Sequence, residues 1–308
     1  MTSAIEDNIR TMAVGRTSFV IKTVNLAAVV LPLVGVVVAC ILLWGWGFSW
    51  VHLGLLLGMY LVTGLGITIG YHRLFTHRAF QTNNVMKSIL AICGSMAVEG
   101  PVLKWVADHR RHHQHSDHEE DPHSPHLHGH GFVGFFQGLW HAHVGWVFKP
   151  DAAGLYRYVG DLKKDPIIRA MHKLFPLWVL LGLLIPAVLG GLLTLSWSGV
   201  LLGFIWGGLV RVGLVHHITW SVNSVCHLWG SKNFRSDDES RNNAIVGILA
   251  FGEGWHNNHH AFPTSARHGL AWWQVDVSYI LIKGMEMVGL AYNVRVPSQE
   301  SIQQKRIA

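Results

Sequence analysis

The chain has little charge for its length of 308 residues. Only 14% of the residues are Asp, Glu, Lys or Arg, against about a quarter in ordinary soluble domains, whereas 50% are hydrophobic. Two long stretches, residues 23–70 and 174–210, contain none of these four residue types. This composition excludes an ordinary soluble domain and predicts a membrane protein.

Cysteine is also scarce, and several common motifs are missing. The three cysteines, Cys40, Cys93 and Cys226, have no CxxC spacing, so we expect unpaired thiols and no iron–sulfur cluster. There is no GxGxxG fingerprint for a dinucleotide and no HExxH motif. These absences weigh against a built-in nicotinamide or flavin domain and against a zinc peptidase.

The positive charge is spread out and does not indicate a nucleic-acid partner. The net charge is +6, and all 24 Lys and Arg lie in residues 1–22, 71–173 and 211–308. Since positive residues concentrate on the cytosolic side of membrane proteins, we expect these segments and both termini there, facing an anionic bilayer surface. The N-terminus does not have the pattern of a cleaved signal peptide.

Each uncharged stretch is long enough for two membrane-spanning helices of about 20 residues. Small and polar residues predict a short turn within each stretch: Gly45, Gly47, Ser49 and Trp50 in the first, and Ser196, Trp197, Ser198 and Gly199 in the second. The predicted segments are an N-terminal tail (1–22), hairpin 1 (23–70), the first part of a cytosolic cap (71–173), hairpin 2 (174–217) and the second part of the cap (218–308). Residues 85–98 and 271–292 are apolar but too short or too charged to span, so we expect interfacial helices there.

The 22 histidines are more than a fold requires, and six of them follow helical spacing. On an α-helix, residues i, i+3 and i+4 share one face. Two triples have this spacing: His109, His112 and His113 in DHRRHH, and His256, His259 and His260 in WHNNHH. Neutral imidazole suits iron and other transition metals, so the two triples can converge on a common centre.

Two further pairs extend this set. His72 and His77 in HRLFTH are separated by i, i+5, which on an ideal helix turns the side chains about 140° apart. Either the helix distorts there, or each imidazole serves a different ion, which would favour a two-metal site. Asn223 and His227 in NSVCH are four apart and share a face where the fourth membrane helix continues into the cap.

Nine histidines exceed the needs of one metal ion, because zinc usually takes four ligands and a facial iron site takes two histidines and a carboxylate. The pattern therefore favours two metals. The overall prediction is an all-α membrane protein with four transmembrane helices in two hairpins and a helical cytosolic cap carrying a di-metal site. We expect the other histidines to be solvated or supporting in a loop (His115, His118, His123, His126, His128, His130) or interfacial (His52, His172, His216, His217), with His141, His143 and His268 undecided.

The boxes HRLFTH, DHRRHH, NSVCH and GEGWHNNHHAFP occur in this order between paired hydrophobic stretches. In this arrangement, and in DPHSP at 121–125, HVGW at 143–146 and GLAY at 289–292, the sequence resembles the stearoyl-CoA (delta-9) fatty acid desaturases, in a bacterial-like form. The resemblance covers residues 50 to 293. It implies four transmembrane helices under a cytosolic cap, with a bent tunnel for the acyl chain and a multi-pass location in a bacterial inner membrane.

The resemblance also implies roles for individual residues. The nine iron ligands would be His72, His77, His109, His112, His113, His227, His256, His259 and His260, and Asn223 would reach a metal through water. Substrate contacts would come from Trp105, Thr219 and Trp220 at the bend, Glu99 beside the tunnel, and Asp108 and Lys149 at the coenzyme end. Two positions depart from the family: Glu99 stands where many members have glutamine, and Ala107 where animal enzymes have an arginine near the coenzyme.

By the same resemblance, the reaction is O2-dependent insertion of a cis double bond, at delta-9, into a saturated long-chain acyl-CoA. The cofactors would be two ferrous ions, with O2 as co-substrate. O2 reduction to two waters needs four electrons, two of which come from the substrate, so a separate donor protein (a ferredoxin, a cytochrome b5-like protein or a reductase) must supply the others. Because Ala107 replaces the arginine, an acyl-lipid or an acyl-carrier protein is the rival carrier.

Two other classes of function stay open on the sequence. A membrane di-iron hydroxylase or alkane monooxygenase uses similar histidine clusters but would form an alcohol. A membrane metal transporter or metal-binding module could use the His-rich loop near residues 115–130. The products and the consumption of O2 would separate these readings.

Overall fold

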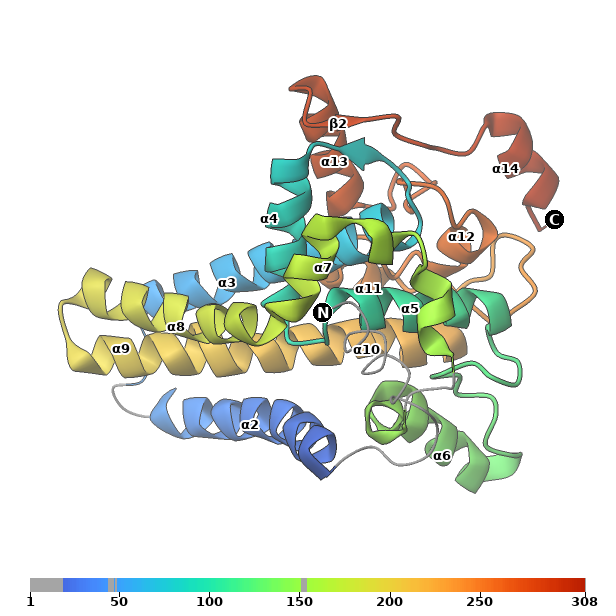
Figure 1. Ribbon diagram of the computed structural model, residues 1–308. Helices are drawn as coiled ribbons and strands as arrows, with labels where there is room; N and C mark the ends of the chain where they lie inside the picture. Colours follow the sequence, from blue (N-terminus) through green and yellow to red (C-terminus); the bar gives the residue numbers. More distant parts are fainter. Residues whose placement is uncertain (1–18, 44–46, 48, 151–153, 308) are drawn as a thin grey trace, which may run out of the picture.

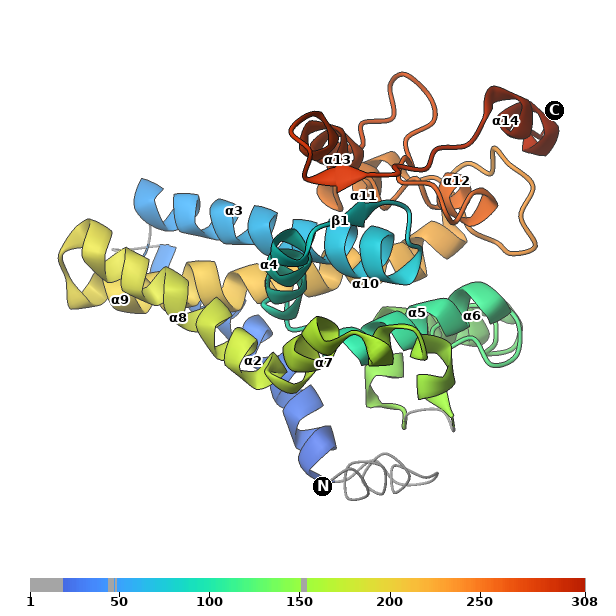
Figure 2. The ribbon, with the colours of Figure 1, turned by 45° about the horizontal axis from the view of Figure 1, so that its top comes forward.

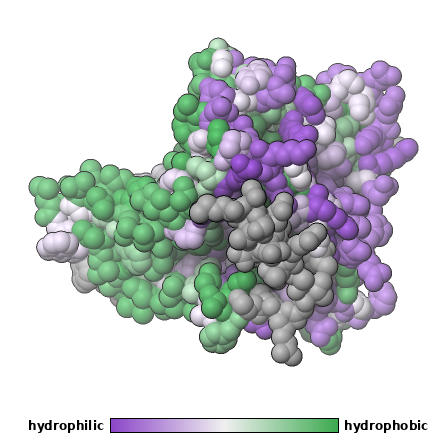
Figure 3. All heavy atoms as spheres, in the orientation of Figure 1, coloured by the Kyte–Doolittle hydropathy of each residue, from purple (hydrophilic) through white to green (hydrophobic). Residues whose placement is uncertain are grey.

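The computed structural model describes residues 19–43, 47, 49–150 and 154–307, and these residues are mostly helical. Four helical stretches are long and apolar enough to cross a membrane: Phe19–Leu42, Trp50–Thr76, Phe175–Thr194 and Trp197–Leu228. Seen side-on, they form an elongated apolar bundle that leads into a more polar cap (Figures 1 and 3). The predicted tail 1–22 and turn residue Gly45 lie largely or wholly outside the described residues.

The four stretches consist of these elements: α2 (Phe19–Leu43); α3 (Trp50–Leu65) continued by the π-helix η1 (Gly66–Thr76); α8 (Phe175–Thr194); and α9 (Trp197–Gly203), the π-helix η5 (Phe204–Val210) and α10 (Arg211–Leu228). Ser49 and Ser196 cap the N-termini of α3 and α9, each accepting a backbone N–H from three residues ahead. Helices α3 and α9 begin at the end of the bundle away from the cap (Figure 1), and their first residues, Trp50 and Trp197, are 79% and 88% exposed. That is where interfacial tryptophans are expected.

Helix α2 packs differently from a simple hairpin partner. Its contacts are mainly with η5 and α10, and the buried cluster around Ala39 includes Leu56 of α3 and Ile205 and Val210 of η5. Figures 1 and 2 show α2 set apart from α3. The fourth stretch therefore lies between the two helices that the sequence joins as hairpin 1. A short connection keeps two helices close along the chain, but side-chain packing determines which helix each one contacts.

Small residues allow α8 and α9 to pack closely as the second hairpin. A Cβ added to Gly190 would lie 2.2 Å from the Gly199 carbonyl oxygen, and one added to Gly203 would lie 2.2 Å from that of Pro186. Such close backbone approach is how helices associate where lipid removes the hydrophobic driving force.

The cap is built from short elements on both sides of α10 (Figure 2). They are β1 (Gln81–Thr82), α4 (Asn84–Ser95), α5 (Val102–His115), α6 (Gly131–His143), η2 (Gly145–Phe148), η3 (Leu155–Val159), η4 (Leu162–Lys164), α7 (Pro166–Lys173), α11 (Ala244–Leu249), α12 (His256–Ala261), α13 (Val277–Met287), β2 (Ala291–Tyr292) and α14 (Gln299–Lys305). The two strands pair antiparallel, with Gln81 opposite Tyr292 and Thr82 opposite Ala291. They tie the first part of the cap to the end of the chain.

The predicted interfacial segments form helices α4 and α13. Residues Leu90, Ala91, Gly94 and Ser95 of α4 are buried, and the helix packs on η1 through close contacts at Gly66 and Gly94. The main buried cluster of the molecule joins η1, α4, α5 and α13, so the core lies where the second membrane helix enters the cap.

Replacing Gly203 by valine should destabilise the α8–α9 hairpin, because the side chain must displace the Pro186 carbonyl. Overpacking of this kind typically costs about 1–3 kcal/mol of stability, so the midpoint of thermal unfolding in detergent should fall clearly. The matched control is Gly58→Val on α3, where an added Cβ meets nothing within 4 Å. Equal midpoints for the two variants would show that α8 and α9 are not packed this closely.

Candidate metal centre

A change of helix type brings His72 and His77 together. Residues 66–76 form a π-helix, and the His77 N–H donates to the His72 carbonyl oxygen at 3.1 Å, a bond from i+5 to i. In such a helix residue i+5 returns over residue i, and the two imidazole rings lie 4.8 Å apart between centroids. Of the two alternatives left open by the sequence, the helix distorts, and both imidazoles join one cluster.

The nine predicted ligands meet in two adjoining groups. The five-His subsite contains His72, His77, His109, His113 and His259, and the four-His subsite contains His112, His227, His256 and His260. Within each group the candidate ligand atoms all lie within 4.8 Å of one another. The triple on α5 is divided, with His109 and His113 in the five-His subsite and His112 in the four-His subsite. The triple on α12 is divided too, with His259 in the five-His subsite and the other two in the four-His subsite. The ligands on each helix therefore face two different points along one edge.

The spacing of the nitrogen atoms fits a metal at each subsite. The Nε2 atoms are 3.0 Å apart for His72 and His259, 2.9 Å for His113 and His259, and 3.0 Å for His227 and His256. Two imidazole nitrogens about 2.1 Å from one metal and at right angles would be about 3.0 Å apart. His77 Nε2 is buried without a hydrogen-bond partner in the described structure. The residues present therefore fit two metal ions.

The imidazoles have the protonation state that metal ligands need. Burial, followed by repulsion from neighbouring imidazoles, holds the pKa of five ligands well below the usual value. They are His77, His109, His113 and His259 of the five-His subsite and His256 of the four-His subsite. A neutral imidazole leaves Nε2 free to bind a metal.

One ligand departs from this pattern. Burial lowers the pKa of His112, but Asp121 outweighs burial and the net shift is upward. A carboxylate that stabilises a proton on this imidazole would equally stabilise a metal cation in its place.

Four carboxylates hold the outer nitrogens of the ligands. His72 Nδ1 lies 2.6 Å from Glu253, His227 Nδ1 2.7 Å from Asp117, and His112 Nδ1 3.0 Å from Asp121. His260 Nδ1 is hydrogen-bonded to Asp238. Such contacts fix the tautomer with Nε2 facing the metal.

These carboxylates are anions in the fold. Burial alone would raise the pKa of Asp117, Asp121 and Asp238. The imidazole that each one contacts, together with other neighbouring imidazoles and the hydrogen bonds that it accepts, outweighs burial, and each pKa lies below its usual value. For Glu253, Arg73 makes the largest opposing contribution to burial and the pKa is again lowered.

The sequence reasoning missed these four carboxylates as site residues. Their signal was position: Asp117 and Asp121 follow DHRRHH closely, and Glu253 precedes His256 of WHNNHH by three residues. Asp238 has no such signal, because it comes from a loop between α10 and α11.

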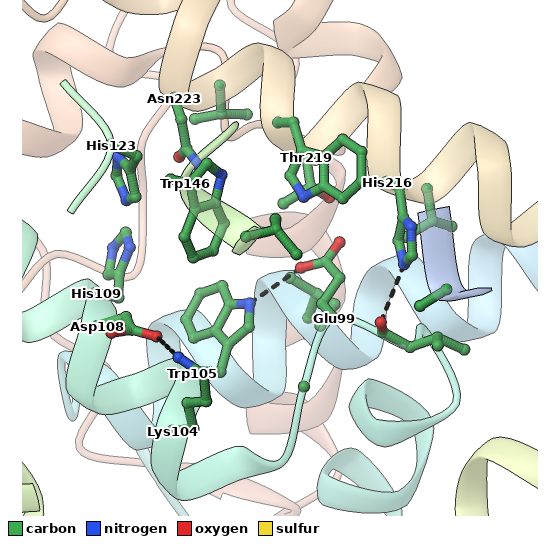
Figure 4. Close-up of a pocket in the computed structure, with 18 of the residues that line it drawn as sticks. Glu99, Lys104, Trp105, Asp108, His109, His123, Trp146, His216, Thr219 and Asn223 are labelled. Atoms are coloured by element: carbon green, nitrogen blue, oxygen red, sulfur yellow. Dashed lines mark hydrogen bonds and ion pairs between the residues drawn. The ribbon is translucent and has the colours of Figure 1, made fainter. Parts of the chain in front are cut away.

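Two of the histidines outside the ligand set also lie beside the centre. The His123 ring lies 4.4 Å from that of His112 between centroids. The His268 ring lies 4.4 Å from that of His259, and His268 Nδ1 is 3.3 Å from Glu253. His52 and His216, predicted at interfaces, are 3% exposed and buried between helices. His216 hydrogen-bonds the carbonyls of residues 97 and 98 (Figure 4).

A cavity of about 710 Å³ adjoins the centre, a volume typical of small-ligand sites. Its wall includes His72, His109 and His256 from the two subsites, and Asn223. All six predicted substrate contacts also line it: Glu99, Trp105, Asp108, Lys149, Thr219 and Trp220. Ala107 does not, because its side chain is fully buried in the core beneath α5.

The other cavity walls are mostly apolar. They include Ala28 and Val29 of α2, Ile67 of η1, Val215 of α10 and Phe251. The first membrane helix therefore contributes directly to the cavity, although it holds no candidate metal ligand among the described residues. A space of this kind suits a hydrocarbon chain.

Two polar contacts occur in the cavity wall (Figure 4). Trp105 Nε1 donates to Glu99 Oε2 at 3.0 Å, and Lys104 Nζ lies 2.7 Å from Asp108 Oδ2. Burial raises the pKa of Glu99 to about 7, although the Trp105 indole opposes the rise. The Glu99 carboxyl is therefore mostly protonated below neutral pH and partly protonated at neutral pH.

Buried imidazoles in two groups beside an apolar cavity indicate a class of protein in which a histidine-held di-metal site adjoins a cavity suited to an apolar ligand. A family model described as "Fatty acid desaturase" matches residues 48–294. The chain belongs to the fatty acid desaturase family. It is thus an oxidoreductase of lipid metabolism, and the buried histidine clusters are consistent with a di-metal site.

Characterised relatives cover most of the chain. It is 46% identical over 281 residues to a hex-5-enoyl-[acyl-carrier protein] acetylenase of Moorena producens (strain JHB), covering 91% of this chain and 88% of the relative. It is 41% identical over 257 residues to an sn-1 stearoyl-lipid 9-desaturase of Anabaena variabilis, covering 82% and 87%. An icosanoyl-CoA 5-desaturase of Limnanthes douglasii is 37% identical over 240 residues, covering 76% and 62%.

Replacing His227 by alanine should remove about one metal ion per chain, because His227 belongs to the four-His subsite alone. The measurement is metal content per purified protein by mass spectrometry. His130→Ala is the matched control, since His130 is exposed and lies outside both subsites. Full metal content in the His227 variant would exclude this residue as a ligand.

Replacing Glu99 by glutamine should stabilise the protein at alkaline pH. The unfolded chain releases the Glu99 proton around pH 4.5, whereas the fold retains it to about pH 7, so this group lowers stability progressively as the pH rises through that window. The full cost, on the order of 3 kcal/mol, applies above pH 7.

The midpoint of thermal unfolding should therefore be higher for Glu99→Gln than for the natural protein at pH 8, and equal at pH 4.5. Glu119→Gln serves as control, because Glu119 is exposed. A Glu99 variant whose advantage does not change with pH would show that this carboxyl is already ionised in the fold.

Proposed function

We propose that this protein is an O2-dependent fatty acyl desaturase that introduces a cis double bond, at delta-9, into a saturated long-chain acyl group. Two iron ions held by the nine histidines would be its cofactor. The observation that carries the proposal is the shared wall: histidines of both subsites line the same cavity as apolar residues of all four apolar helical stretches.

The metals, when bound, would supply the oxidising chemistry that removes hydrogen from two neighbouring methylene groups. Reduction of O2 to two waters takes four electrons, two from the substrate and two from an external donor. The protein's own part is to hold the chain beside the histidines, where small displacements cost large factors in rate, and to exclude water. Val215, Ile67 and Phe251 provide such an apolar wall.

The electron donor is proposed to be a separate protein. The donor would approach from the cap, since the histidines and carboxylates of the centre belong to it. We further propose a multi-pass protein of a bacterial inner membrane with both termini and the histidine boxes in the cytosol. The segments would be the tail, the two hairpins and the two parts of the cap given above.

Two kinds of acyl carrier are candidates. Coenzyme A is the carrier that the resemblance implied, and two relatives are named as acting on acyl-CoA. A lipid or an acyl-carrier protein is favoured by the names of the Anabaena variabilis and Moorena producens relatives described above. The cavity supports the second candidate, because Lys104 is paired with Asp108 and Ala107 offers no charge for the phosphates of coenzyme A.

Expression in a desaturase-deficient host should produce a cis-monounsaturated fatty acid, with its double bond located by mass spectrometry. His256→Ala should lower the product more than about 100-fold, whereas His130→Ala should retain it. An alcohol in place of the alkene would establish the hydroxylase alternative and contradict the proposal.

The carrier can be resolved in membranes from the same host. Labelled stearoyl-CoA, stearoyl-acyl-carrier protein and sn-1 stearoyl glycerolipid are each supplied with reductant, and the labelled product is identified on its carrier. Product on only one carrier before any acyl exchange identifies the substrate.

A further inference from the structure

The carboxylates that support the ligands are unevenly divided between the two subsites. In the four-His subsite, Asp121, Asp117 and Asp238 each contact the Nδ1 of a different ligand, so three of four ligands are supported. In the five-His subsite Glu253 alone supports a ligand, His72. Among the described residues, no other carboxylate forms an ion pair with a ligand of that subsite.

The negative charge of Glu253 is also offset. The guanidinium of Arg73, which is fully buried, forms an ion pair with Glu253, and its other arm lies 3.1 Å from Asp276. The two subsites therefore differ in the number of carboxylates and in how much of their charge is neutralised.

The three aspartates of the four-His subsite receive hydrogen bonds mainly from neutral donors. Asp117 accepts from the Ser124 hydroxyl at 2.7 Å and the Glu239 backbone N–H at 2.9 Å, and Asp121 accepts from the backbone N–H of His123 at 3.0 Å.

Asp238 accepts from the hydroxyls of Ser236 and Ser240. The Lys232 ammonium contacts the backbone carbonyl of Asp238, not its carboxylate, and forms an ion pair with Glu239. No Lys or Arg in the described part of the chain forms an ion pair with any of the three carboxylates.

A carboxylate on the outer nitrogen makes an imidazole a stronger donor to its metal, and loss of one such partner typically lowers metal affinity about 10–100-fold. Its charge also attracts the cation directly, most strongly in a buried site. Ligand number works in the opposite direction, since the other subsite has one more imidazole.

We infer that the two subsites are unequal and that the four-His subsite, supported by three unneutralised aspartates, binds its metal ion more tightly. The inference rests on the metal centre of the proposed function. Asp117, Asp121 and Asp238 are in this view positioning residues that act through the ligands. The extra carboxylates outweigh the extra imidazole, so the five-His subsite loses its metal first.

The test is stepwise removal of metal from the purified holoprotein in detergent. The protein is equilibrated with increasing concentrations of a metal chelator, and bound iron per chain is counted by mass spectrometry. Two steps are expected. Asp121→Asn removes the charge but keeps a carbonyl acceptor. It should lower the chelator concentration at the second, more resistant step by about 10–100-fold and leave that of the first step unchanged.

Asp237→Asn is the matched control, because this exposed neighbour of Asp238 contacts no ligand; it should shift neither step. Asp238→Asn repeats the test from another loop if Asp121→Asn does not fold. A shift of the first step by either variant would overturn the inference. Loss of both ions in one step from the natural protein would overturn it as well.

Failure of the inference can be told apart from failure of the proposed function. A holoprotein that holds fewer than two metal ions per chain before chelation contradicts the di-metal centre itself. Two ions that leave in the opposite order contradict only the inequality drawn from the carboxylates.

Discussion

A buried imidazole can bind a metal only if its inner nitrogen is bare, and a partner on its outer N–H holds it in that orientation. Burial favours the neutral form of most of the ligands, and carboxylates hold the outer nitrogens of four of them. The loops of the cap take their shape from these bonds. Asp117, for example, joins His227 at the end of α10 to the backbone of Glu239, and so fixes two loops against the last membrane helix.

The same requirement extends into the membrane helices. His72 and His227 lie at the cap ends of the second and fourth stretches, so the centre is attached to the bundle at two points. Arg73 reinforces the first of them, because its guanidinium joins η1 to Glu253, Asp276 and the Ala266 carbonyl. Arg211 does the same in the fourth stretch by donating to the carbonyls of Met96 and Gly182. Movement of either helix would disturb the centre.

Much of this arrangement can be read from the sequence, because apolar length and helical spacing are local properties. The four apolar stretches and the triples on α5 and α12 follow from them. The π-helix at residues 66–76 does not, since it depends on close packing of Gly66 and Gly70 against α4, a contact between distant segments. For the same reason the division of each triple between two subsites could not be foreseen. Spacing shows which side chains share an edge, but tertiary packing determines which point they face.

The partners of the ligands were harder still to predict. Asp238 is 22 residues from His260 in sequence and comes from an irregular loop, where no periodicity places a side chain. The packing of α2 on η5 instead of α3 has the same cause, because the short connection between α2 and α3 constrains only the chain path. Long-range choices of this kind depend on the fit of whole surfaces, which single residues do not reveal.

Burial has one further effect that links the centre to its cavity. The environment that removes protons from the imidazoles also retains the proton on Glu99, because in both cases the charged form is penalised. Cation and anion are disfavoured alike, so the wall facing the hydrocarbon stays uncharged near Trp105. The paired carboxylates keep their charge only because each one has an imidazole or a guanidinium against it. A single physical cause thus favours neutral imidazoles in the centre and a neutral carboxyl at Glu99, whereas the carboxylates of Asp108 and Glu253 in the same wall are each paired with a cation.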